Sequence, residues 1–160
     1  MPFSDDEPIL ITEKSTLKTF ILISGISLYF FSLFSNCFCT ANNCMTSFQA
    51  LALGWFDIFI GGAAGTAASW FGNPFLILSW FLLAKNNNWA WIVAMVASFL
   101  SLLFLKSEVI IENEAGYITP IIKIGLGYWL WLSSCLTTLV GSLTIRIIKF
   151  KKSQPIKFSY

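Results

Sequence analysis

Long apolar runs separated by short polar connections dominate the chain. Lys18 and Lys85 are separated by 66 residues in which Asp57 is the sole charged residue. A helix needs about 20 apolar residues to cross a bilayer, and in lipid such a run must be helical so that every backbone N–H and C=O finds a partner. The pattern predicts an all-α integral membrane protein with a single membrane domain over residues 1–160.

The apolar runs predict four transmembrane helices. Their expected limits are residues 17–35, 63–84, 89–105 and 124–145. The second run begins earlier, at Leu51, so its 34 residues are too many for one crossing and few for two crossings with a turn. Residues 46–62 are therefore expected to form an extra interfacial or re-entrant helix on the outer side.

Basic residues next to the spans indicate the orientation, because Lys and Arg gather on the cytoplasmic side. The segment 146–160 contains Arg146 and four lysines without an acid, which favours a cytoplasmic C-terminus. Lys14 and Lys18 favour the same side for the N-terminus. The run 51–84 then starts outside and ends inside at Lys85, so it must cross an odd number of times, and its length permits one crossing.

Asn73 and Pro74 lie near the middle of the second predicted span. Proline removes one helical hydrogen bond and clashes with the preceding turn, so we expect a kink there. The carbonyl left free, near Ser69 and Trp70, needs another donor, and Asn73 or Ser69 is expected to supply it.

Small residues recur four and then three positions apart around the outer end of this span, at Gly61, Gly65 and Ala68. Such spacing lets two helices approach closely. The partner is either another helix of the same chain or a second copy of the protein.

Asp57 is the one acid within the apolar runs. In the single-crossing arrangement it lies near the outer headgroups, where it reaches solvent or caps local backbone. A carboxylate close to the membrane core is also a candidate functional group. An ion-handling role would require Asp57 to share a polar cavity with the Asn73–Pro74 break.

Three cysteines crowd the predicted first outer loop, at Cys37, Cys39 and Cys44. A disulfide between Cys44 and either Cys37 or Cys39 would close a small loop and leave one thiol over. The last outer loop has two β-branched runs around Glu-Asn-Glu-Ala-Gly, a pattern typical of a small β-hairpin, with Pro120 confining its second arm to an edge.

The composition argues against catalysis. The chain is 56% apolar and 11% charged and has no histidine, which removes the commonest general base and metal ligand. It contains no nucleotide-binding, nucleophile-elbow or zinc-protease motif. We therefore expect no enzyme activity, no catalytic residue, no metal, no cofactor and no nucleic-acid partner.

The segments GW, WFGNPFLILSW, NEAG and GYWLWLSS occur in this order over residues 51–135. With them the chain resembles a group of small, uncharacterised bacterial inner-membrane proteins with about four spans. The resemblance implies a bacterial inner-membrane location and supplies no activity. The expected function is a non-enzymatic role through contacts with lipid, with itself or with another membrane protein; the alternative is a small oligomeric channel or transporter that uses Asp57 and the Asn73–Pro74 break.

Overall fold

The computed structural model describes residues 7–55, 64–111 and 118–153. The chain is mostly helical and has small strands. Its helices are α1 (Glu7–Leu33), α2 (Ser47–Leu53), α3 (Ala64–Trp70), α4 (Gly72–Ala84), α5 (Ala90–Leu103), the 3₁₀ turn η2 (Phe104–Lys106) and α6 (Leu126–Ser153). Its strands are β1 (Asn36–Cys39), β2 (Cys44–Thr46), β3 (Val109–Ile111), β4 (Ile118–Pro120) and β5 (Lys123–Ile124).

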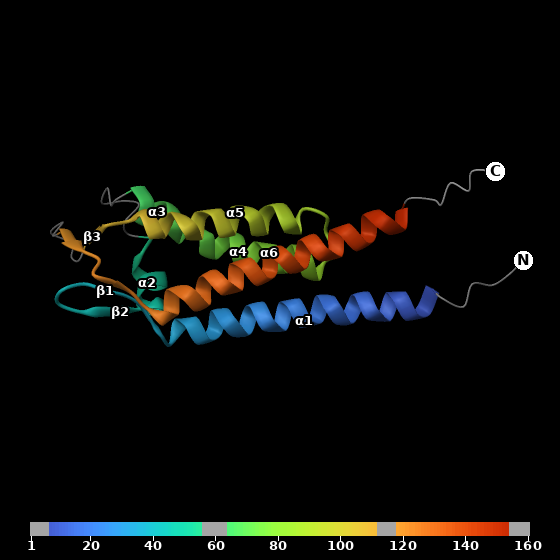
Figure 1. The fold of residues 1–160 in the computed structure, drawn as a ribbon, viewed down its shortest axis with the longest axis horizontal. Coiled ribbons are helices and arrows are strands. Elements are labelled where there is room, and N and C mark those ends of the chain that lie inside the picture. Colours follow the sequence, from blue (N-terminus) through green and yellow to red (C-terminus); the bar gives the residue numbers. More distant parts are fainter. Residues whose placement is uncertain (1–6, 56–63, 112–117, 154–160) are drawn as a thin grey trace, which may run out of the picture.

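The long helices run along one axis (Figure 1). The strands, α2 and α3 lie at one end, which we call the sheet end. The connection between α4 and α5, the start of α1 and the close of α6 lie at the other, which we call the turn end. Both termini therefore emerge at the turn end.

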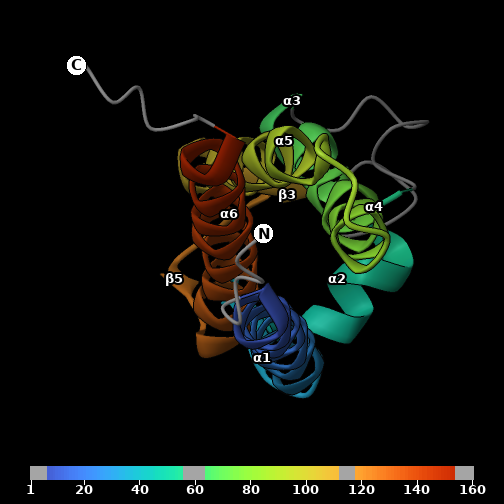
Figure 2. The ribbon, with the colours of Figure 1, turned by 90° about the vertical axis from the view of Figure 1, so that its right-hand side faces the viewer.

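Viewed from the turn end, the order around the bundle is α1, α6, α5, α4 (Figure 2). Neighbours in this order pack against each other. The short helix α2 lies on the side between α1 and α4, at the sheet end. The chain after the cysteine loop thereby returns to the bundle as α2, which contacts α1.

Three stretches are long and apolar enough to cross a membrane: Ser15–Leu33, Thr66–Ala84 and Leu126–Lys151. They match three of the four predicted spans. The stretch that corresponds to the remaining predicted span, Ala90–Lys106, is a shorter apolar helix. Its 17 residues span about 25 Å, at the lower limit for a bilayer crossing.

The bundle is apolar outside and hydroxyl-rich inside. Large apolar side chains point outward along every long helix; examples are Phe20, Ile23, Phe30, Phe31, Ile77, Phe81, Phe99 and Val140. Seven of the buried hydroxyls donate to a backbone carbonyl; they belong to Ser32, Ser79, Ser98, Ser101, Ser134, Thr138 and Ser142. Buried apolar residues such as Leu76 and Ala97 complete the interior, so what distinguishes the bundle from a water-soluble domain is its large exposed apolar surface.

Helices α1 and α6 approach closely along small residues. A Cβ added at Gly141 would lie 2.6 Å from two side-chain carbons of Ile21, so only glycine fits there without rearrangement. About two turns earlier in α6, Ser134 Oγ donates to the Gly25 carbonyl at 2.7 Å. A hydrogen bond between helices and close backbone approach are the interactions that hold helices together where water is absent.

Aromatic residues at the start of α6 do not all lie at the surface, as an interfacial belt would require. Trp129 is 49% exposed, as expected of a belt residue, but Tyr128 is fully buried and Trp131 is 8% exposed. Tyr128 stacks on Phe104, and its hydroxyl donates to the Ser101 carbonyl at 3.0 Å. Tyr128 and Trp131 therefore form part of the core, and only Trp129 faces outward as a belt residue would.

The strands form two small sheets. The predicted hairpin in the last loop is present: β3 and β4 pair antiparallel, with Val109 opposite Pro120. A second sheet, not predicted, has the order β2-β1-β5 and joins the cysteine loop to the segment before α6, with Phe38 opposite Ile124. The two loops are thereby tied together by backbone hydrogen bonds.

The turn end has a compact structure. Asn86 follows α4 in the left-handed conformation, with φ of 56°, and the next amide, of Asn87, donates to the Leu82 carbonyl at 2.9 Å. This pattern is a Schellman motif, in which asparagine is the best substitute for glycine. Two lysines bind the turn: Lys18 Nζ lies 3.3 Å from the Ala84 carbonyl, and Lys149 Nζ lies 3.0 Å from that of Asn86.

Candidate functional site

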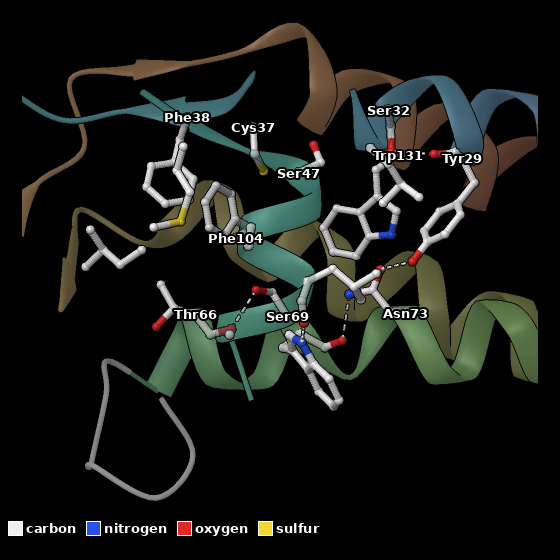
Figure 3. A pocket seen from close by; sticks show the side chains of 17 residues that line it. Tyr29, Ser32, Cys37, Phe38, Ser47, Thr66, Ser69, Asn73, Phe104 and Trp131 are labelled. Carbon is white, nitrogen blue, oxygen red and sulfur yellow. Dashed lines mark hydrogen bonds between the residues drawn. The ribbon is translucent and has the colours of Figure 1, made fainter. Parts of the chain in front are cut away.

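A cavity of about 70 Å³ lies inside the sheet end (Figure 3). It lies among α1, α2, α3, the first turn of α4, η2 and α6. Its lining residues are Tyr29, Ser32, Leu33, Cys37, Phe38, Met45, Ser47, Ala50, Leu51, Gly54, Thr66, Ser69, Trp70, Asn73, Phe104, Ile110 and Trp131. We call it the sheet-end cavity.

Asn73 lies at the break between α3 and α4. Pro74 has no N–H for the Trp70 carbonyl four residues earlier, and the side chain of Asn73 fills that role, since Nδ2 donates to this carbonyl at 3.0 Å. The kink expected at Asn73 and Pro74 lies elsewhere: the helix is interrupted at Phe71, and α4 continues from Gly72 through Pro74, because proline is tolerated in the first turn of a helix, where backbone N–H groups have no helical partner. Of the two donors expected for the freed carbonyl, Asn73 is the one that supplies it.

The other end of the Asn73 amide is occupied too. Tyr29 Oη of α1 donates to Asn73 Oδ1 at 3.1 Å (Figure 3). The Tyr29 ring also makes an edge contact with Trp80 of α4, with centroids 5.6 Å apart. The Asn73 side chain therefore supplies the hydrogen bond that the Trp70 carbonyl lacks at the helix break, and it links α4 to α1 through the Tyr29 hydroxyl.

Helix α2 forms one wall of the cavity because its start is fixed by a capping box. The Gln49 amide donates to Thr46 Oγ1 at 3.3 Å, and the Thr46 amide donates to Gln49 Oε1 at 2.9 Å. Trp70 of α3 donates from Nε1 to the Leu51 carbonyl at 2.9 Å. The interfacial or re-entrant helix predicted over residues 46–62 is thus present at Ser47–Leu53, where it packs against the span that follows it.

The cysteine loop is closed by a disulfide between Cys39 and Cys44. Cys37 is the thiol left over, and it is buried. Burial raises the pKa of the Cys37 thiol to about 11, because the thiolate would lose its hydration there. The Ser47 hydroxyl lies close by without completing a hydrogen bond of ordinary geometry. A protonated, buried thiol is a poor nucleophile and a poor metal ligand.

The cavity wall is neutral. No charged side chain lines it within the described ranges, and most of its polar groups are already engaged with backbone carbonyls, as Ser32 and Ser69 are. The indole Nε1 of Trp131 is buried without a partner among the described groups. The volume exceeds what a single water molecule needs, so the arrangement suits water or a small uncharged molecule.

Metal and acid–base chemistry find little support here. Within the part of the chain that the structure describes, no three His, Cys, Asp or Glu side chains gather closely enough to hold a metal ion. The cavity offers hydroxyls, amides, indoles and a thiol whose pKa is raised. None of these is a general base near neutral pH.

Two of the predicted site residues lie outside the described residues: Asp57 and Gly61. The distance test between Asp57 and Asn73 therefore stays a prediction. Of the small-residue stripe, Gly65 and Ala68 are in α3, which packs against α5 of the same chain. This contact supports the intrachain interpretation for the part of the stripe that is described.

Sequence reasoning missed Tyr29 and Trp131 as members of the site. Each has a polar atom on a large apolar body and lies in an apolar run. Such an atom needs a partner when it is buried in lipid or protein. The signal was therefore available for Tyr29, but nothing in the sequence identified Asn73 of another helix as its partner.

No family model, curated protein or solved structure matches this chain. The resemblance to small bacterial inner-membrane proteins therefore stays a prediction.

Proposed function

We propose that this chain is a four-span protein of a bacterial inner membrane that acts through contacts with other proteins, itself or lipid. The observation that carries the proposal is the apolar outer surface of the bundle. Val140 is 63% exposed on α6, whereas Ser134 of the same helix is fully buried. An apolar surface of this extent in water would drive aggregation, but it is the expected surface against lipid.

The fourth crossing rests on the geometry of α4 and α5. The two helices pack side by side and are joined by a tight turn, so a membrane that contains α4 also contains most of α5. The length of Ala90–Lys106, 17 residues, is at the lower limit for such a helix.

The proposed orientation has the turn end in the cytoplasm. Lys18, Lys85, Arg146 and Lys149 gather there, in agreement with the positive-inside rule. The disulfide between Cys39 and Cys44 lies at the opposite end. Disulfides persist in the bacterial periplasm and are rare in the cytosol, so the two chemical markers support the same orientation.

A role through contacts, without catalysis, is supported by how the polar groups are used. Most of the buried hydroxyls donate to backbone carbonyls, as those of Ser32 and Ser69 do, and both ends of the Asn73 amide are bound. These groups stabilise the fold and are not poised to act on a substrate.

The alternative, an oligomeric channel or transporter, has one observation in its favour: Asn73 and the helix break line the sheet-end cavity. Broken helices form substrate sites in transporters. The neutral wall and the fully bonded Asn73 amide weigh against ion passage, so contact-mediated function stays the leading proposal.

Topology in intact cells tests the proposal. After mild reduction, an impermeant maleimide should label Cys44, which is exposed, from outside. A cysteine introduced at Asn87, in a variant lacking the native cysteines, should react only after the cells are opened. Labelling of Asn87→Cys in intact cells, or recovery of the protein in the soluble fraction, would overturn the proposal. The native mass in mild detergent then separates a monomer from the oligomer that a pore requires.

A further inference from the structure

The turn end gathers positive charge beyond what fastening the turn requires. The described cations there are Lys18, Lys85, Arg146, Lys149 and Lys151. Glu108 is the one carboxylate among the described side chains, and it lies at the sheet end. Among described groups this end therefore has no neutralising partner.

Two of these cations are held in fixed positions on one face of α6. The Arg146 guanidinium lies over the Trp91 ring, with its central carbon 4.1 Å from the ring centroid. Three residues further, Lys149 Nζ donates to the Asn86 carbonyl and, at 3.1 Å, to Asn88 Oδ1. Positions three apart are neighbours on a helix surface, so both cations face the start of α5.

A hollow of about 20 Å³ lies between these groups. It is lined by Leu83, Asn86, Asn87, Asn88, Ala90, Trp91, Ser142, Ile145, Arg146 and Lys149. Its volume is enough for a single small group such as one oxygen atom of a phosphate.

From this arrangement we infer that Arg146 and Lys149 form a binding site for the phosphate group of an anionic phospholipid of the cytoplasmic leaflet. The inference rests on the membrane location proposed above. The planar fork of an arginine guanidinium matches two phosphate oxygens, and no hydrogen bond of Arg146 is found among the described residues. Lys149 supplies a second positive charge beside it.

The surroundings favour a lipid over a soluble phosphate. Trp89, which is 64% exposed, lies at the same level of the bundle, and exposed tryptophans settle at the headgroup region of a bilayer. Earlier in α6, toward the sheet end, outward apolar residues such as Val140 provide a surface for acyl chains.

Arg146→Gln and Lys151→Gln form a matched pair that tests the site. Each removes one positive charge from the same end of α6, but Lys151 does not line the hollow. The purified variants are placed in nanodiscs of phosphatidylcholine, with and without phosphatidylglycerol, and the melting temperature is measured as phosphatidylglycerol is increased. The lipid-dependent rise reports binding, and the value in pure phosphatidylcholine reports any structural damage.

We expect phosphatidylglycerol to raise the melting temperature of the wild type and of Lys151→Gln equally. Arg146→Gln should need about tenfold more phosphatidylglycerol for the same rise, because one charge-assisted contact is lost. Equal weakening in both variants would mean diffuse attraction to a charged surface and would overturn the site. So would a wild type indifferent to phosphatidylglycerol.

Two further arms keep the test decisive. Inorganic phosphate added to phosphatidylcholine nanodiscs should leave the melting temperature unchanged, and a rise there would overturn the lipid assignment. If Arg146→Gln does not fold, Arg146→Lys keeps the charge but loses the planar fork, and it should still need several-fold more phosphatidylglycerol. Protease protection in the nanodisc separates the proposals: loss of insertion contradicts the proposed function, whereas an inserted protein without lipid preference contradicts this site alone.

Discussion

The two ends of the bundle are closed by different chemistry. At the sheet end, strands, one disulfide and a cluster of stacked aromatic rings join five separate segments around a cavity. At the turn end, a short asparagine turn is bound by Lys18 and Lys149 through exposed hydrogen bonds. Buried apolar contacts and buried hydrogen bonds stabilise far more than exposed polar contacts do, so the sheet end should contribute more to stability.

The largest effect should come from the sheet end, at Gly127. A Cβ there would lie 2.3 Å from Ser47 Oγ and 2.6 Å from the Ser35 carbonyl. Because the carbonyl is backbone and cannot swing away, Gly127→Ala should lower the free energy of unfolding by about 3 kcal/mol. Thermal unfolding in detergent measures the loss. Val140→Ile also adds one methyl group to α6, at an exposed position, and should be nearly neutral; a similar loss in both would contradict the comparison.

The disulfide should contribute next. Replacing Cys39 and Cys44 by serine removes the closure of a short loop, which by loop entropy costs about 2 kcal/mol. We expect hydrogen exchange to quicken in β1 and β2 while the α4–α5 turn keeps its protection. Adding a reductant to this variant should change nothing further, whereas it should reproduce the effect in the wild type. Equal quickening at both ends would show that they are not independent.

Loss of the hydrogen bond between Tyr29 of α1 and Asn73 of α4 should have an intermediate effect on the free energy of unfolding. Tyr29→Phe removes one donor, at a cost of about 1 kcal/mol. Asn73→Leu removes the partners of both the Tyr29 hydroxyl and the Trp70 carbonyl, at a cost of about 2 kcal/mol. The double variant should lose less than the sum, by about 1 kcal/mol, since the two residues share a bond. Strict additivity in the unfolding free energies would contradict the hydrogen bond between them.

The sequence predicted the features of this fold that depend on the average polarity of many neighbouring residues or on the backbone N–H that proline lacks. Helical spans follow from the mean polarity of about 20 neighbours, so no single contact had to be known. The break before Pro74 follows from a missing N–H. The hairpin of β3 and β4 follows from local β-branched runs with a turn between them.

What the sequence could not provide are contacts between distant segments. Tyr29 and Asn73 are 44 positions apart, and many hydroxyls offered Tyr29 an equally plausible partner. Each aromatic residue at the start of α6, namely Tyr128, Trp129 and Trp131, combines an apolar ring with one polar group. Only the rotation of α6 about its axis decides that Trp129 faces outward. The disulfide partner of Cys44 was left open between Cys37 and Cys39, because both loops are short enough to close.

The smallest effect should come from the turn end, at Asn86. Its left-handed backbone is strained for most residues but natural for glycine. Asn86→Gly removes that strain and also removes a weak acceptor, since Lys18 Nζ lies 3.4 Å from Asn86 Oδ1. The backbone carbonyl that Lys149 binds remains. The two changes oppose each other, so the free energy of unfolding should shift by less than about 0.5 kcal/mol.

Asn86→Val is the informative counterpart, because a β-branched residue resists this conformation and should cost about 1–2 kcal/mol. If thermal unfolding finds Asn86→Gly as damaging as Asn86→Val, the side-chain contact with Lys18 matters more than the backbone, and the turn end is held more strongly than its exposure implies.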